Sequence, residues 1–289
     1  MTVKEMQTCA SETLDYFFKV MPDAPFIADD IVIEFAPQGK MAERYRELAA
    51  IYKPTMWLNT SRERELNSTI AGNALIGKGK SAVLMRADRR YTPPHLRHDV
   101  FHELSHIFCG KLENSESFID VYGDGTTGPE VPDNKIYDGM INAGYSVWSE
   151  FIAEYYTQKH TEPKRKLAEM TRTMYSFLNE VTLQNQLHVK SPFAYACSYF
   201  LNAEDAAEEL ASLSEEHSDT NEGTTFYICL NALYKQVQKD KPWEITEDFI
   251  HDIGSKYLMY FSAKFADQLM PMFIPAAFGR DNNKERPHV

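Results

Sequence analysis

A helix that carries two histidines four residues apart constrains this chain more than any other sequence feature. Residues 102–106 have the sequence His-Glu-Leu-Ser-His. Pro93 and Pro94 begin the predicted helix, where a missing backbone N–H has no cost, and it runs to about Cys109, with Gly110 as its C-terminal cap. The two histidines therefore lie on one helix face. The rest of the segment is largely apolar, which predicts a core helix: Val100, Phe101, Leu104, Ile107 and Phe108.

Two imidazoles at this spacing suit a single zinc ion (Zn2+). Both His102 and His106 can reach one zinc at about 2.0–2.1 Å. Glu103 lies roughly 100° around the helix from His102, so it flanks the metal without ligating it. That is the position of a general base that activates zinc-bound water. The alternative is a pair of packed or solvated histidines, with Glu103 in an ordinary salt bridge.

The third zinc ligand has to come from elsewhere in the chain, because a catalytic site needs three protein ligands and one open position. The metzincin extension His-x-x-Gly-x-x-His is absent, since Cys109 replaces its glycine. Downstream, Glu150 and Glu154 are four apart within an otherwise apolar segment. Buried carboxylates need partners, so this pair indicates a nearby cation. Three alternatives for the third ligand remain: Glu116, Asp120 and Asp99. Asp99 more naturally serves the N-terminal turn of its helix. A solvated pair facing Lys159 or arginines is the other interpretation of the two glutamates.

These two helices resemble the gluzincin group of zinc metallopeptidases, in which His-Glu-x-x-His is followed by a second helix with Glu-x-x-x-Asp or Glu-x-x-x-Glu. The resemblance covers roughly residues 81–110 and 141–160. It implies that Glu150 is the third ligand and that Glu154 accepts the free imidazole N–H of His102. It also implies a zincin-like fold with a sheet edge before the metal helix. Residues 81–87 are the expected edge, binding substrate by strand addition.

The remaining pattern predicts an α+β chain with a small sheet, followed by a mostly helical C-terminal half. Alternation and β-branched residues predict strands, and helical periodicity predicts helices. The strands are expected at 30–35, 55–58, 73–76 and 81–87, the last two as a hairpin, and the helices at 4–21, 40–52, 141–158, 167–187, 194–213, 224–239 and 246–269. We divide the chain into an α+β region with the zinc helix (1–110), a helical region that completes the cleft (111–278) and a polar, disordered tail (279–289). The polar stretch 111–139 is predicted to be a long loop.

Composition excludes several classes of function. The formal net charge of -12 argues against nucleic-acid binding. The four cysteines are widely spaced and form no Cys-x-x-Cys pair, which favours a reducing compartment. The N-terminus has no apolar signal core, and no apolar run reaches the roughly 18 residues of a membrane span. We therefore expect a cytoplasmic protein without a membrane partner. Residues 72–79 approach a phosphate-binding loop but lack its final Ser or Thr.

The sequence thus predicts zinc-dependent hydrolysis of a peptide bond in a peptide or protein substrate. One alternative is a zinc-binding regulatory or interaction protein with little general peptidase activity, and another is a hydrolase of a non-peptide bond. Four residues are candidates for stabilising the oxyanion, and sequence does not choose among them: Tyr145, Tyr137, His188 and His217. His98, four before His102, is expected behind the ligands or on the surface.

Overall fold

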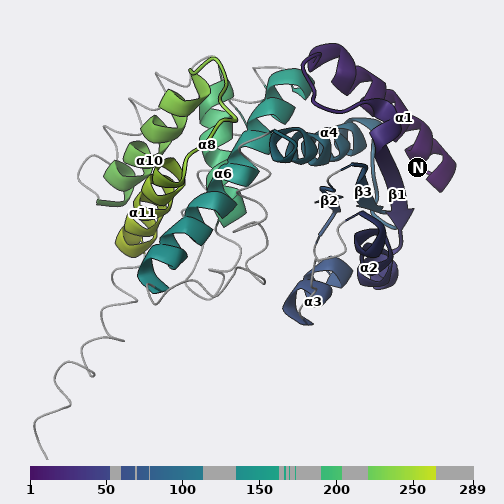
Figure 1. The fold of residues 1–289 in the computed structure, drawn as a ribbon, viewed down its shortest axis with the longest axis horizontal. Helices are drawn as coiled ribbons and strands as arrows, with labels where there is room; N and C mark the ends of the chain where they lie inside the picture. The colour runs from purple at the N-terminus through teal and green to yellow at the C-terminus, as the bar shows by residue number, and fades with distance from the viewer. Residues whose placement is uncertain are drawn as a thin grey trace, which may run out of the picture.

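The computed structural model describes residues 1–52, 60–68, 70–77, 79–112, 135–162, 166, 169, 173, 190–203 and 221–264. Within them a small sheet with its helices forms one end of the molecule and a group of longer helices forms the other (Figure 1). The predicted α+β class is confirmed. The strand predicted at 55–58, nearly all of the helix predicted at 167–187 and the tail at 279–289 lie outside the described residues.

The described residues contain one sheet of three strands in the order β1-β3-β2. Strand β1 (Ile31–Ala36) is parallel to β3 (Ser81–Arg86), and β2 (Gly72–Leu75) is antiparallel to it. The predicted hairpin is confirmed, but the expected edge strand is wrong. Residues 81–86 are the central strand, and β2 is the edge strand that contacts α4 (Pro93–Gly110). The physical reason is that β3 is buried from Ser81 to Met85 and apolar on both faces, as a strand paired on both sides should be.

Alternate residues of β3 pack into two different cores. Val83 and Met85 join a core with α1 (Val3–Val20) and α4 (Pro93–Gly110), the predicted histidine helix. Ala82 and Leu84 join a second core with α2 (Met41–Tyr52) and Leu66 of α3 (Thr60–Ser68). This alternation follows from the period of two in a strand. Helices therefore cover both faces of the sheet, and α4 is fixed against β2 and β3.

The other end of the molecule is built around α6 (Lys135–Thr161), which contacts α4, α8 (Lys190–Asn202) and α11 (Glu247–Lys264). Helix α10 (Asn221–Val237) packs on α11. Helix α6 begins six residues earlier than the helix predicted from residue 141. Where α6 crosses α11, a Cβ on Gly144 would lie 1.9 Å from the carbonyl oxygen of Ile250, and a Cβ on Gly254 would lie 1.8 Å from that of Met140. Glycine therefore permits direct backbone contact between the two helices.

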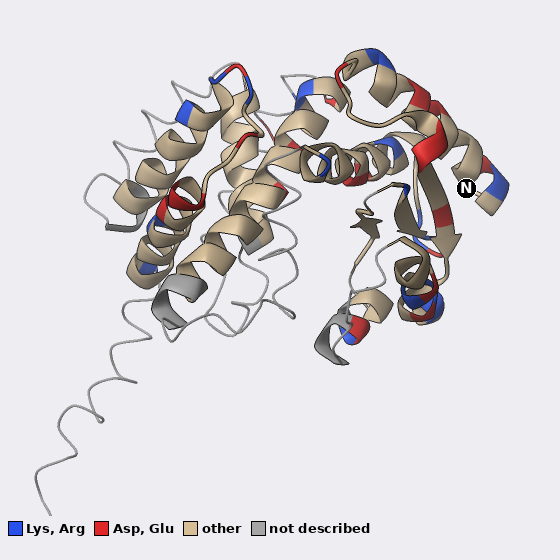
Figure 2. Ribbon diagram, in the orientation of Figure 1, with Lys and Arg blue, Asp and Glu red and all other residues tan. Residues whose placement is uncertain are grey.

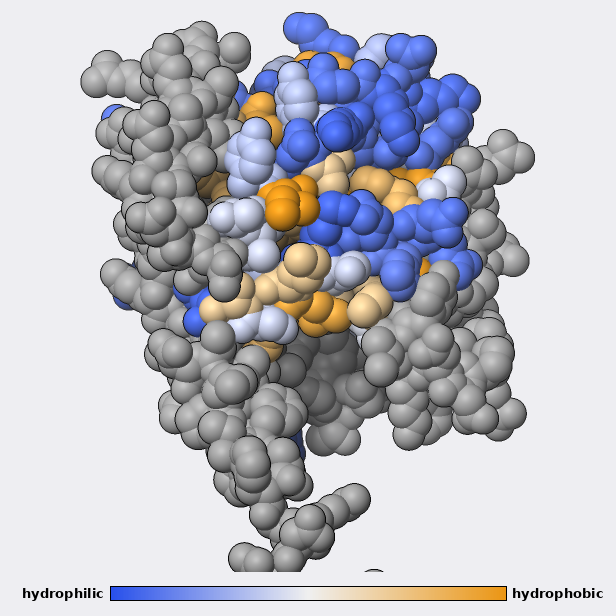
Figure 3. Space-filling model, turned by 90° about the vertical axis from the view of Figure 1, so that its left-hand side faces the viewer, coloured by the Kyte–Doolittle hydropathy of each residue, from blue (hydrophilic) through white to orange (hydrophobic). Residues whose placement is uncertain are grey.

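Charged residues are common on the outer helices and sparse along α6 (Figure 2). On the side of the helical end turned to the viewer in Figure 3, hydrophobic side chains reach the surface in small groups between hydrophilic ones. None of the helices in the described part of the chain combines the length and apolar character needed to cross a membrane. Because few charged residues lie along α6, Glu150 and Glu154 in the second half of this helix are unusual.

Candidate metal centre

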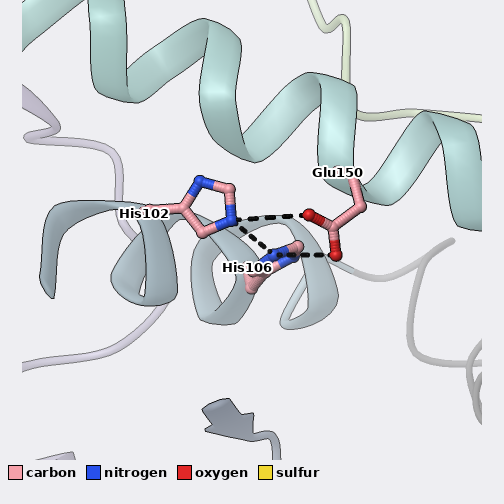
Figure 4. Close-up of side chains that lie close together, drawn as sticks. All are labelled: His102, His106 and Glu150. Carbon is pink, nitrogen blue, oxygen red and sulfur yellow. Dashed lines mark hydrogen bonds and ion pairs between the residues drawn. The ribbon is translucent and has the colours of Figure 1, made fainter. Parts of the chain in front are cut away.

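Three predicted ligands come together where α4 crosses α6 (Figure 4). The Nε2 atoms of His102 and His106 are 3.1 Å apart. Glu150 approaches from α6, with Oε2 3.7 Å from His102 Nε2 and Oε1 4.0 Å from His106 Nε2. The i, i+4 spacing on α4 aligns the imidazoles, and helix crossing brings the carboxylate opposite them. Of the described residues, these three form the only such group of potential metal ligands, with all ligand atoms within 4.8 Å of one another.

The donor atoms lie near the spacing that a zinc ion requires. Ligands at about 2.0–2.2 Å in a tetrahedral site are separated by about 3.3–3.6 Å. The two Nε2 atoms are 3.1 Å apart, and they lie 3.7 and 4.0 Å from different oxygens of Glu150, so side-chain rotations have to bring one carboxylate oxygen toward both imidazoles. Two imidazole nitrogens and one carboxylate are also a common ligand set of catalytic zinc, which leaves a fourth position open. The residues therefore fit zinc in chemistry and in spacing.

Glu154 contacts the Nδ1 side of the His102 ring, opposite the Nε2 atom that faces the other ligands. Its Oε2 atom is 2.8 Å from His102 Nδ1, the contact that the resemblance implies. Burial raises the pKa of Glu154, but the charges and hydrogen bonds of His98 and His102 outweigh burial and leave it well below its usual value. The pKa of His102 is lowered by burial, yet hydrogen bonds with Glu150 and Glu154 raise it well above normal. A metal ion bound at Nε2 would therefore displace a proton, while Glu154 would keep the Nδ1–H.

Behind His106 the partner is neutral. Its Nδ1 lies 3.2 Å from the Ser149 hydroxyl on α6. Burial, followed by the charge of His102, lowers the pKa of His106 to about 4. His106 is therefore uncharged near neutral pH and offers a lone pair to a metal without releasing a proton. The two ligand histidines differ in their outer partners, with a carboxylate for His102 and a hydroxyl for His106.

Glu103, the predicted general base, lies against the edge strand β2. Its side chain is buried, and a Cβ on Gly72 would lie 3.0 Å from its Oε1 and 3.1 Å from its Cγ. The backbone N–H of Ala74 donates a hydrogen bond to its carboxylate. Burial raises the pKa of Glu103, the charge of His102 opposes this, and the result is about 7. A base with a pKa near neutrality is well matched to proton transfer.

Strand β2 is the last strand of the sheet within the described residues. The N–H of Arg86 donates to the carbonyl of Ala71 at 2.8 Å, which sets the phase of the β2–β3 ladder. Because hydrogen-bonded and non-hydrogen-bonded pairs alternate in an antiparallel ladder, Gly72 and Ala74 direct their backbone groups away from β3. The bond from Ala74 to Glu103 agrees with this phase. The outer edge of β2 therefore runs beside the predicted base.

Tyr195, on α8, is a site residue that sequence reasoning missed. Its hydroxyl donates to Glu150 Oε2 at 2.9 Å, and its ring meets that of His102 edge-on, with centroids 5.8 Å apart. Burial raises the pKa of Tyr195 well above its usual value, so the hydroxyl remains a donor. A sequence signal existed: α8 is mostly apolar but carries polar groups at helical spacing, each bonded to α6, namely Tyr195, Ser198, Tyr199 and Asn202.

The other predicted candidates lie away from the ligands or outside the described residues. Asp99 forms an ion pair with Arg89 at 3.1 Å. Tyr145 hydrogen-bonds Ser149, one helical turn along α6. Of the two places expected for His98, it takes the one behind the ligands, where it lies partly buried against Glu154. Several candidates are not among the described side chains: Glu116, Asp120, Tyr137, His188 and His217.

Comparison with known proteins adds no name to this geometry, since the chain matches no protein-family model, no curated protein and no solved structure. The chemical interpretation of the site therefore rests on its residues.

Proposed function

We propose that this chain is a zinc-dependent peptidase of the gluzincin type with a zincin-like fold. The observation that carries the proposal is the convergence of His102, His106 and Glu150 beside Glu103 and the outer strand of the sheet. A metal-binding cluster alone would fit a structural site. The buried carboxylate next to it and the sheet-edge strand beside that carboxylate are the additional parts that peptide hydrolysis requires.

His102, His106 and Glu150 would hold the metal. When bound there, zinc polarises the scissile carbonyl and acidifies a water molecule. Glu154 fixes the ring of His102 through its Nδ1–H, and Ser149 does the same for His106. The ligand set within the described residues has three members, which leaves room for substrate chemistry at a fourth position.

An extended peptide would bind along β2, pairing with the outward backbone groups of Gly72. Glu103 would accept the proton of the attacking water and deliver it to the departing amine as the peptide bond breaks. The Ala74 N–H holds the Glu103 carboxylate at this edge. The strand that aligns the substrate therefore also orients the base, which brings the two reacting groups to one place.

Tyr195 is the described donor best situated to stabilise the developing oxyanion. Its protonated hydroxyl bonds a carboxylate oxygen of Glu150 at the ligand cluster. A donor fixed beside the reacting carbonyl stabilises the negative charge that forms on its oxygen. Of the four residues considered from sequence, only Tyr145 has a described side chain, and Tyr195 is preferred to it because Tyr145 bonds Ser149 and not a ligand.

The test is to measure metal content and hydrolysis together. Purified protein should contain about one zinc per chain and should cleave members of a fluorogenic peptide library, with activity lost on chelation and restored by zinc. Glu103→Gln should retain zinc and lose hydrolysis, because the amide cannot accept the proton. Full activity in that variant would refute the mechanism.

A second outcome would point to the regulatory alternative. Zinc at one per chain without cleavage of any library member would indicate a zinc-binding interaction protein. In that case Glu103→Gln would leave every measured property unchanged, whereas a peptidase must respond to it. The matched control is Glu12→Gln, which makes the same chemical change at an exposed position of α1.

A further inference from the structure

His98 occupies a partly buried position one helical turn before His102 on α4, where it faces α6. Its Nε2 is 3.1 Å from Glu154 Oε1, and its Nδ1 is 3.5 Å from Glu162 Oε1, just beyond the end of α6. The second distance is within ion-pair range but is too long for a good hydrogen bond, and Nδ1 has no other hydrogen-bond partner. The ring thus lies between two carboxylates, with its side chain only 18% exposed.

This arrangement favours the imidazolium form of His98. A neutral imidazole has one N–H, so it would direct a lone pair at one of the two carboxylates, whereas the cation donates from both nitrogens. Burial lowers the pKa of His98, but the charge and hydrogen bond of Glu154, together with the nearby Glu162 carboxylate, raise it to about 9. Lys166 pairs with the remaining oxygen of Glu162, 2.5 Å away, and fixes this outer carboxylate.

Glu154 connects His98 to the metal centre. Its Oε2 faces His102 Nδ1 at 2.8 Å. Its Oε1 receives Gln158 at 2.9 Å and Tyr199 at 3.3 Å and also faces His98. Once zinc occupies Nε2 of His102, that ring is neutral, and His98 is the cation that remains beside the buried Glu154 carboxylate among the described residues.

We propose that His98 is a positioning residue of the metal centre: it holds the Glu154 carboxylate toward the Nδ1–H of His102 and thereby strengthens zinc binding. The inference rests on the zinc site of the proposed function, but not on peptide hydrolysis. It assigns a role to the ion-paired group formed by His98, Glu154 and Glu162. If His98 only joined α4 to α6, its substitution would lower the stability of the fold and leave the zinc affinity unchanged.

The experiment measures zinc affinity of the full chain by competition with a chromophoric chelator, without substrate. His98→Gln should weaken zinc binding about 10- to 100-fold, the range for partners of ligating histidines. His95→Gln is the matched control, because it makes the same change on the exposed side of α4, and its affinity should equal that of the wild type. An affinity within twofold of wild type in His98→Gln would overturn the proposal.

A double-mutant cycle tests whether His98 acts through Glu154. In the Glu154→Gln background, His98→Gln should cost little further zinc affinity, whereas additive losses would overturn the assignment. A spectroscopic measurement on the zinc-loaded protein gives an independent result. The downfield proton resonance of His102 Nδ1–H should move upfield in His98→Gln and stay in place in Ile253→Val, a core variant on α11 that lowers only stability.

Two further outcomes are separable. If His98→Gln does not fold, Glu162→Gln removes the outer carboxylate alone. It should weaken zinc binding by a smaller factor than Glu154→Gln. Unchanged zinc affinity in Glu162→Gln would refute the proposal. A wild-type chain that binds zinc but cleaves no peptide would refute the proposed activity and leave the role of His98 intact. A wild-type chain that takes up no zinc would refute both.

Discussion

On one side of the candidate metal centre, polar side chains of α6 and α8 are linked to each other by hydrogen bonds. On the other side, strand β2 contacts Glu103 through its backbone. The helical wall consists of Glu150, Glu154, Tyr195 and Tyr199, linked to the histidines and to each other by hydrogen bonds. The sheet wall consists of Gly72 and Ala74 of β2. It positions Glu103 through one backbone N–H and a missing Cβ.

The difference reflects what each wall must do. A metal ligand inside a protein needs partners that offset its desolvation and keep its direction. The general base must exchange protons, and a single backbone donor orients it without fixing its charge. Removing one hydrogen-bond partner on the helical wall should therefore have an intermediate effect, because other partners remain. Glu103 has no second described donor on the sheet wall, so a small change there should have a large effect on activity.

The largest effect is expected from the ligand of the helical wall. Glu150→Ala should lower zinc affinity by more than about 100-fold, because loss of a ligand exceeds the 10- to 100-fold effect of an outer partner. Metal analysis of the purified variant and chelator competition measure this. The control is Glu43→Ala, an exposed carboxylate paired with Lys40 on α2. Retention of one tightly bound zinc in Glu150→Ala would exclude Glu150 as a ligand.

Tyr195→Phe separates oxyanion stabilisation from metal binding on the same wall. We expect kcat to fall about 100- to 1,000-fold, the loss caused by removing one oxyanion donor, while zinc stays bound because its three ligands remain. Steady-state kinetics with parallel metal analysis measure both. Tyr227→Phe, at an exposed site on α10, is the control. A fall in zinc content with unchanged kcat for the loaded fraction would instead make Tyr195 a support of Glu150.

On the sheet wall, Gly72→Ala should show how closely Glu103 is held. The new Cβ would lie 2.7 Å from the flexible end of Met85 and 3.0 Å from Glu103 Oε1, so the carboxylate has to move. A displacement of about 1 Å costs about 100-fold in rate, and zinc content should not change. Gly39→Ala, where a Cβ meets nothing within 4 Å, is the control. Unchanged kcat in Gly72→Ala would show that Glu103 does not depend on β2.

The two walls also differ in how far sequence predicts them. The group of His102, Glu103 and His106 follows from helical spacing, since neighbours on one helix need no tertiary information. The apolar surroundings of Glu150 and Glu154 indicate only a nearby cation, and their roles as ligand and as partner of His102 come from the resemblance to gluzincins. Both inferences use local periodicity, and the convergence of the ligand side chains agrees with them.

The sheet wall could not be derived in the same way. The central place of β3 depends on its parallel pairing with β1, more than 40 residues away in sequence, and local alternation does not reveal which strand is the edge. Gly72 looked like part of a turn-rich loop, and its contact with Glu103 exists only after α4 packs on the sheet. Tyr195 lies in a helix whose packing partner cannot be read from sequence, so sequence does not show which element the polar residues of that helix face.

The smallest effect should come from the neutral partner of His106. Ser149→Ala removes one hydroxyl contact, at 3.2 Å, and a net hydrogen bond is worth about 0.5–1.5 kcal/mol. We therefore expect zinc affinity to fall about 2- to 10-fold, less than in Glu154→Gln, which removes the charge beside His102. Ser146→Ala, whose hydroxyl donates to Asn142 within α6, is the matched control. If Ser149→Ala weakened zinc binding as much as Glu154→Gln, the two histidines would rely on their outer partners equally, and a charged partner would give His102 no advantage.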